Sequence, residues 1–260
     1  MLILCYGMPK SGSTLAFELV KGTLNSAGFR QETFVNHARG LEDQDRNLPG
    51  LRNFVKNLDR EVIQSVLDEI GPDRRIAVKT HSHFPEADFA WIEQQQQNGK
   101  LRIIASYRDP REMCLSLMDA AEKARERGLE AFGGIELMRR AQRNVRNRIV
   151  DFRRWAAIKG ALRLSYDTVA FLPDEAIGQI EDYLQIKSDR EAVKYYAFAE
   201  APTQKNKAKR DRYKELSEAQ NKEMLRRFGE YIRRVCEQDE QSWFDECRTA
   251  MLKMNASESA

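Results

Sequence analysis

Cysteine is scarce in this chain and is nowhere closely paired. The 260 residues contain four cysteines without a CxxC pair, and three of them lie in apolar or helical patterns where a thiol packs as a small hydrophobic group. We therefore expect reduced cysteines and no metal site. The four residues are Cys5, Cys114, Cys236 and Cys247.

Long hydrophobic runs are also missing. The opening apolar run has only five or six residues and no basic segment before it, so it is too short for a membrane span and unlike a cleaved signal peptide. We therefore expect a cytoplasmic protein without stable membrane insertion.

A large excess of charge of one sign is absent as well. The 43 basic and 40 acidic residues leave a net charge of +3, which gives no reason to expect nucleic acid as a partner. The hydrophobic content of 42% is ordinary for a globular protein, and the chain has no internal repeat. We expect one domain over 1–260, with an α/β core at 1–170 and a mostly helical part at 171–260.

Four short runs with the character of β-strands alternate with helical segments. This alternation predicts an α/β fold with a central parallel sheet flanked by helices, similar to P-loop NTPases, and a helical C-terminal extension. In such a sheet the ligand binds beyond the carboxyl ends of the strands. The expected strands are 2–6, 75–79, 101–107 and 161–165, and the expected helices start at Ser13 or span about 59–70, 86–97, 110–127, 135–158, 214–236 and 240–254.

A Gly, Lys and hydroxyl-rich turn, reading GMPKSGST at 7–14, follows the first strand and leads into a helix. Gly7 and Gly12 allow a tight bend, so that backbone N–H groups and the start of the helix can converge on an anion. The spacing differs from a Walker A loop because Ser13 stands where the lysine should be, and the lysine has moved forward to Lys10. The turn therefore predicts a phosphate-binding loop of another kind.

The third strand ends in a second segment suited to an anion. Arg108 follows the strand, Pro110 suits a first helical turn, and Ser116 lies eight positions after the arginine. Both Arg108 and Ser116 can thus approach one anionic group.

These two segments resemble motifs of sulfotransferases that use 3′-phosphoadenosine 5′-phosphosulfate (PAPS). Pro-Lys-Ser-Gly-Ser-Thr at 9–14 is similar to their 5′-phosphosulfate loop, and YRDPREMCLSLM at 107–118 is similar to their 3′-phosphate motif. The resemblance implies PAPS as cofactor, adenosine 3′,5′-bisphosphate (PAP) as product, and no metal. The cofactor-binding residues that it implies are Lys10, Ser11, Gly12, Ser13, Thr14, Arg108 and Ser116.

The second strand ends in Lys79, Thr80 and His81, a run similar to the Lys-Thr-His that supplies the catalytic histidine of cytosolic sulfotransferases. A histidine near neutral pKa can accept the proton of an attacking alcohol. We expect His81 as general base, with Lys79 and Lys10 as further catalytic residues. His83, two positions on, is a neighbour on the same side of an extended chain. A carboxylate serves instead in carbohydrate-acting members, and the candidates for that role are Glu42, Asp43 and Asp45.

The remaining family features are present only in part. Ser165-Tyr166-Asp167 is similar to a segment whose tyrosine lies against the adenine, so the resemblance implies that role for Tyr166, although a core tyrosine is the competing interpretation. Leu15 replaces a stacking tryptophan. The late Arg-Lys-Gly that closes over the 3′-phosphate is missing, and a basic stretch offers substitutes in Lys205, Lys207, Lys209 and Arg210. The polar region between Gly28 and Leu58 resembles a mobile loop or lid.

The resemblance implies an in-line transfer of a sulfuryl group from PAPS to a hydroxyl or amine of a small-molecule or carbohydrate acceptor. One alternative is a nucleotide-dependent kinase with an atypical phosphate loop, which predicts dependence on magnesium. Another is a non-catalytic nucleotide- or RNA-binding module that uses the basic C-terminal helices. The sequence specifies neither the acceptor nor the oligomeric state.

Overall fold

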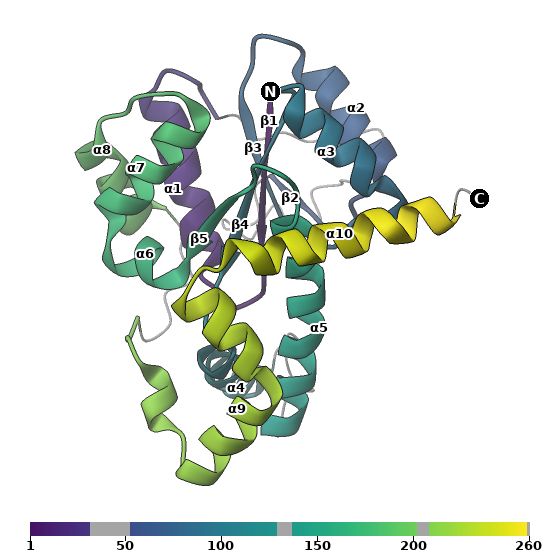
Figure 1. The fold of residues 1–260 in the computed structure, drawn as a ribbon. Helices are drawn as coiled ribbons and strands as arrows, with labels where there is room; N and C mark the ends of the chain where they lie inside the picture. The colour runs from purple at the N-terminus through teal and green to yellow at the C-terminus, as the bar shows by residue number, and fades with distance from the viewer. Residues whose placement is uncertain (32–52, 129–136, 202–207, 259–260) are drawn as a thin grey trace.

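The computed structural model describes residues 1–31, 53–128, 137–201 and 208–258, and within them five strands form one parallel sheet (Figure 1). The order across the sheet is β2-β3-β1-β4-β5, with β1 at the centre. The expectation of an α/β fold with a parallel sheet is confirmed. The strands are β1 (Leu2–Gly7), β2 (Phe54–Val55), β3 (Ile76–Thr80), β4 (Leu101–Tyr107) and β5 (Leu162–Ser165).

The four strands expected from the sequence lie within one residue of their predicted positions. The short strand β2 was not predicted, because two residues are too few to establish an alternating pattern. It pairs with the carboxyl end of β3, where Phe54 lies opposite Lys79 and Val55 opposite Thr80.

Helices cover both faces of the sheet. The sequence predicted a separate helix for α1 and for each of α2 to α5, α9 and α10. For the stretch that holds α6, α7 and α8 it predicted no separate helices, only a mostly helical part from residue 171 onward. The helices are α1 (Ser13–Ser26), α2 (Arg60–Ile70), α3 (Phe89–Gln97), α4 (Pro110–Glu126), α5 (Met138–Ala156), α6 (Tyr166–Phe171), α7 (Pro173–Leu184), α8 (Arg190–Tyr195), α9 (Glu218–Tyr231) and α10 (Gln241–Glu258). Shorter helical turns are η3 (Glu86–Asp88), η4 (Tyr196–Glu200), η5 (Arg212–Glu215) and η6 (Ile232–Glu237).

The central strand divides its side chains between two apolar cores. Leu2, Leu4 and Tyr6 pack with residues of α2, α3, α4, α5, α9 and α10, whereas Ile3 and Cys5 pack with α1, α7 and α8. This alternation is what a strand buried on both faces requires, since successive side chains point to opposite sides. Figure 1 shows α1, α6, α7 and α8 grouped on one side of the sheet.

All four cysteines are free thiols, as expected. Within the described part of the chain, no helix has both the length and the apolar character needed to cross a bilayer.

Candidate functional site

The strands bring the segments singled out in the sequence to one edge of the sheet. The register places Gly7 opposite Ser106, Tyr6 opposite Thr80, and Tyr107 opposite Ser165. Because all these strands are parallel, the chain leaves each of them at the same edge. The loop after β1, His81, Arg108 and Tyr166 therefore emerge as neighbours.

The loop after β1 is shaped by backbone positions that favour glycine. Gly12 has a φ of 80°, and a Cβ there would lie 2.6 Å from a ring carbon of Tyr166. Lys10 also has a positive φ, 71°, a conformation that costs a non-glycine residue energy and is concentrated at functional sites. The backbone thus adopts a positive φ twice within three residues.

Ser11 uses its donors inside the loop. Its N–H donates to the carbonyl of Met8 at 3.0 Å and its hydroxyl donates to the same carbonyl at 2.7 Å. The hydroxyl also lies 3.2 Å from the Ser106 hydroxyl, which joins the loop to β4. In this structure Ser11 shapes the loop, and its expected contact with a nucleotide stays a prediction.

Helix α1 presents its first turn to the same region. Gly12 is its N-cap and has no side chain to cap the helix, so the amides of Ser13 and Thr14 lack the carbonyl partner that residues farther along the helix have. The Thr14 hydroxyl accepts a hydrogen bond from the Lys79 ammonium at 2.7 Å, which leaves its own proton to donate. These are donors suited to a phosphate oxygen.

Lys79 is a buried cation at the end of β3. Its side chain lies under the loop, and burial lowers its pKa to about 8, opposed by the charge of Glu18 and assisted by that of Lys10. Burial also lowers the pKa of Lys10, with Lys123 as the second cause. Two ammonium groups at one edge, both partly stripped of water, form a region that favours an anion.

His81 and His83 point to different partners. The His81 ring contacts the Gly7 carbonyl through Nδ1, so Nδ1 carries the proton and Nε2 keeps a lone pair. Burial, followed by the charge of Lys79, lowers the pKa of His81 to about 3. His83 is exposed, and its Nδ1 lies 3.5 Å from the carboxylate of Asp151 on α5. His81 is therefore the histidine attached to the loop.

Arg108 is held on three sides. Its Nε and Nη2 donate to Glu112 Oε2 at 2.9 and 2.8 Å, and its Nη1 lies 3.5 Å from the carbonyl of Lys10. Its guanidinium carbon lies 3.6 Å from the centre of the Tyr166 ring. The segment 107–118, called the arginine motif below, and the loop after β1 are thus in direct contact.

Tyr166 sits between the loop and Arg108. One neighbour is Gly12, and another is the Arg108 guanidinium, which lies on a ring face. Phe171 packs edge-on against the ring at a centroid distance of 5.8 Å. The ring therefore supports Arg108 in this structure, and its expected contact with adenine stays a prediction.

The other predicted site residues either lie apart from these contacts or fall outside the described part of the chain. Ser116 is buried on α4. Lys209 lies 3.5 Å from Glu215, and Arg210 stacks over Phe171. Glu42, Asp43, Asp45, Lys205 and Lys207 lie outside the described residues.

Two residues that the sequence analysis did not single out join this site. Glu112 is buried and accepts from Arg108 through one oxygen and from the backbone N–H of Arg212 through the other, at 2.8 Å. Arg108 precedes α4 by two residues, and its ion pair with Glu112 in the first turn spans four positions, a spacing that could have been noticed in the sequence. Arg212 follows the basic stretch that contains Lys209 and Arg210, and nothing in the sequence marks it as buried.

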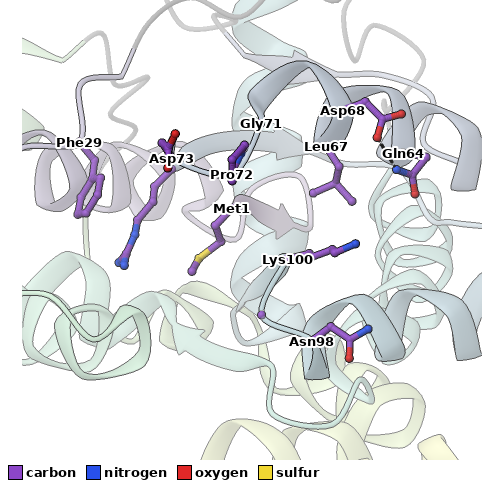
Figure 2. A pocket seen from close by; sticks show the side chains of 12 residues that line it. Met1, Phe29, Gln64, Leu67, Asp68, Gly71, Pro72, Asp73, Asn98 and Lys100 are labelled. Carbon is purple, nitrogen blue, oxygen red and sulfur yellow. Dashed lines mark hydrogen bonds between the residues drawn. The ribbon is translucent and has the colours of Figure 1, made fainter.

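One cavity adjoins the carboxyl edge of the sheet, where the candidate site lies, and a second lies at the opposite edge. One of about 200 Å³ adjoins Arg108 and is lined also by Tyr166, Asp167 and Tyr213. A cavity of about 710 Å³ lies at the opposite edge, where Met1 and Lys100 precede β1 and β4 (Figure 2). The second cavity is therefore not part of the candidate site.

No protein-family model matches the sequence, and no curated protein matches it. Among solved structures, the chain is similar to retinol dehydratase in complex with retinol and PAP, with 18% identity, a TM-score of 0.49, and coverage of 89% of this chain and 81% of that one. It is also similar to retinol dehydratase in complex with androsterone and inactive cofactor PAP, with 16% identity, a TM-score of 0.46, and coverage of 89% and 80%. Both similarities are distant, so the activity of this chain is inferred below from its own residues and not from these proteins.

Proposed function

We propose that the protein transfers a sulfuryl group from PAPS to a hydroxyl or amine of an acceptor. The observation that carries the proposal is the contact between Arg108 and the Lys10 carbonyl, because it makes one surface of two segments suited to anions. A nucleotide with phosphates at both its 5′ and 3′ positions has anionic groups for both segments. ATP lacks the 3′-phosphate.

PAPS, when bound, supplies an activated sulfuryl group on its 5′-phosphate. The acceptor oxygen or nitrogen forms a bond to sulfur, the bond from sulfur to the phosphate oxygen breaks, and the electron pair stays on that oxygen. The acceptor proton passes to a base. The products are PAP, the sulfated acceptor and the protonated base.

The loop provides the groups that stabilise charge on the departing phosphate oxygen. Lys10, Lys79 and the first amides of α1 lie at the edge where that oxygen would be held. Donors fixed before the reaction stabilise developing charge without reorganising. The chain therefore has the donor set that fits a phosphosulfate.

His81 is the proposed base. Its Nδ1–H is directed to the Gly7 carbonyl, which leaves Nε2 to accept the acceptor proton. A pKa near 3 makes it a weak base in the free protein, and the positive charge of Lys79 is one cause. A bound anion opposes that charge and raises the basicity of Nε2. The acceptor class is left open, small molecule or carbohydrate.

Calorimetry with PAP, ADP and ATP tests the proposal, followed by transfer of labelled sulfate from PAPS to a panel of alcohols, phenols, amines and sugars. We expect PAP to bind without added metal and more tightly than ADP. Lys10→Ala should abolish transfer while leaving the circular dichroism spectrum unchanged, whereas Lys100→Ala, at the opposite edge, should leave transfer unchanged. Tighter binding of ATP in the presence of magnesium, with no binding of PAP, would favour the kinase and overturn the proposal.

A further inference from the structure

Glu112 is a buried carboxylate that joins two parts of the chain far apart in sequence. Its Oε2 accepts from Nε and Nη2 of Arg108, and its Oε1 accepts from the backbone N–H of Arg212 at 2.8 Å. Each oxygen thus has its own donor. The first donor group belongs to the arginine motif and the second to η5, which follows residues 202–207.

The segment around Arg212 is attached to α4 at further points. The Arg212 guanidinium is buried and forms an ion pair with Asp119 at 2.9 Å. Arg111 stacks on the ring of Tyr213 at 4.1 Å. Glu112 is the member of this contact set that also holds Arg108, so the position of η5 and the orientation of that guanidinium are linked through one side chain.

The bonds to Glu112 decide which part of Arg108 stays available. The carboxylate occupies the edge formed by Nε and Nη2, and the Tyr166 ring covers one face. Nη1 lies 3.5 Å from the carbonyl of Lys10, so one of its two N–H groups faces the loop. The second N–H of Nη1 and the outer N–H of Nη2 point away from the carboxylate. A planar guanidinium fixed in this way can present the same donors to each incoming phosphate, at a small entropic cost.

On the basis of the proposed function, we propose that Glu112 is the positioning residue for the 3′-phosphate: it presets Arg108 and fastens η5 beside it. A carboxylate is required because both oxygens must accept. A glutamine at this position has one oxygen and one NH₂ group, so either Arg108 or the Arg212 amide would face a donor instead of an acceptor.

The chain offers a matched control. Glu181 on α7 accepts from Nε and Nη2 of Arg190 through one oxygen, at 3.0 and 2.6 Å, and from the backbone N–H of Ser188 through the other, at 2.8 Å. The bonding pattern is that of Glu112 with one further bond, from the Ser188 hydroxyl to the same oxygen as the Ser188 N–H, at 2.8 Å. Helix α7 packs against α1, α6 and α8, away from the arginine motif. Glu181→Gln therefore imposes the same chemical change at a remote position.

The test measures the PAP preference, defined as the Kd of adenosine 5′-monophosphate divided by the Kd of PAP. In Glu112→Gln we expect the PAP preference to fall roughly 10- to 100-fold, the size of one hydrogen bond to a charged group, with the Kd of the monophosphate nearly unchanged. Glu181→Gln should keep the wild-type preference. A merely structural role would weaken both nucleotides equally, and that outcome, or an unchanged preference, overturns the inference.

Hydrogen exchange of the wild-type protein provides a second measurement that needs no variant. We expect PAP to slow exchange of the Arg212 amide, whereas adenosine 5′-monophosphate leaves it unchanged, since only PAP carries the 3′-phosphate that engages Arg108. Equal effects of the two nucleotides contradict the role of Glu112. If the wild-type protein shows no PAP preference at all, the proposed function fails first.

Discussion

The Lys79 ammonium donates a hydrogen bond to the Thr14 hydroxyl at 2.7 Å, and this bond joins the end of β3 to the first turn of α1. The lysine is only 3% exposed, yet its hydrogen-bond partner among the described residues is a neutral hydroxyl. A buried cation without a bonded carboxylate is costly. The bond therefore places an incompletely neutralised positive charge beneath the loop, where an anionic ligand would neutralise it.

The pH dependence of catalysis should reveal this lysine. Burial lowers the pKa of Lys79 to about 8, so its charge is present below that pH and is lost above it. We expect kcat/KM for PAPS to be constant between about pH 6.5 and 7.5 and to fall up to tenfold per pH unit above about 8, because kcat/KM reports the free enzyme. A pH profile of initial rates measures the change.

Lys79→Met separates this lysine from Lys10, whose pKa burial also lowers. The variant should have low kcat/KM at every pH and no decrease centred near 8. A decrease that persists in Lys79→Met would assign the titration to Lys10 instead. Lys100→Met, at the far edge of the sheet, should retain the wild-type profile.

His81 should make the folded state sensitive to acid. Its pKa is about 3 in the folded protein, against an ordinary value of 6.5, because of burial first and Lys79 second. Between these two values the unfolded chain binds a proton that the folded chain does not, so the free energy of unfolding decreases as the pH falls from 6.5 towards 3. Urea unfolding of wild type and His81→Asn at pH 7 and pH 4.5 measures the difference.

The variant should lose less stability than wild type over this pH range, whereas His83→Asn should behave as wild type, because that histidine is exposed. The same imidazole also tests the proposed base. We expect PAP to raise the pKa of His81 in an NMR titration, since the cations that lower it would be neutralised. A pKa that stays near 3 with PAP bound would leave His81 too weak for general-base catalysis.

The sequence was sufficient for the parts of the site that depend on local pattern. Apolar runs located four of the strands, and parallel strands necessarily bring Gly7, His81, Arg108 and Tyr166 to one edge. The glycine spacing likewise predicted a tight turn after β1, and the binding of phosphate there stays a prediction.

Contacts between distant segments could not be predicted. The bond from Arg212 to Glu112 spans 100 positions and depends on how η5 packs against α4. The pairing of the Tyr166 ring with Arg108 depends on the placement of β5 beside β4, and a propensity pattern contains no information on either contact. The bonds of Ser11 to the Met8 carbonyl are local, but the glycine-rich pattern did not specify them either.

Gly12 should be intolerant of alanine for two separable reasons. Its φ of 80° costs a residue with a Cβ about 1–2 kcal/mol, and that Cβ would also lie 2.6 Å from Tyr166. Gly28, in the left-handed position after the end of α1, is the matched control, because its φ is 88° but nothing lies within 4 Å of a Cβ there. We expect Gly28→Ala to lose stability only, and Gly12→Ala to lose more stability and to bind PAP more weakly. Equal unfolding midpoints and equal affinities for the two variants would contradict the contact with Tyr166.

Replacing Tyr166 should distinguish a support for Arg108 from a platform for adenine. The guanidinium lies 3.6 Å from the ring centre, and a cation–π contact contributes about 0.5–2 kcal/mol. We expect Tyr166→Leu to weaken PAP about 2- to 30-fold and adenosine 5′-monophosphate little, with Tyr166→Phe close to wild type. Phe29→Leu, which removes a remote stack on Arg75, should change neither affinity. If Tyr166→Leu instead weakens both nucleotides equally, the ring contacts the adenine that they share.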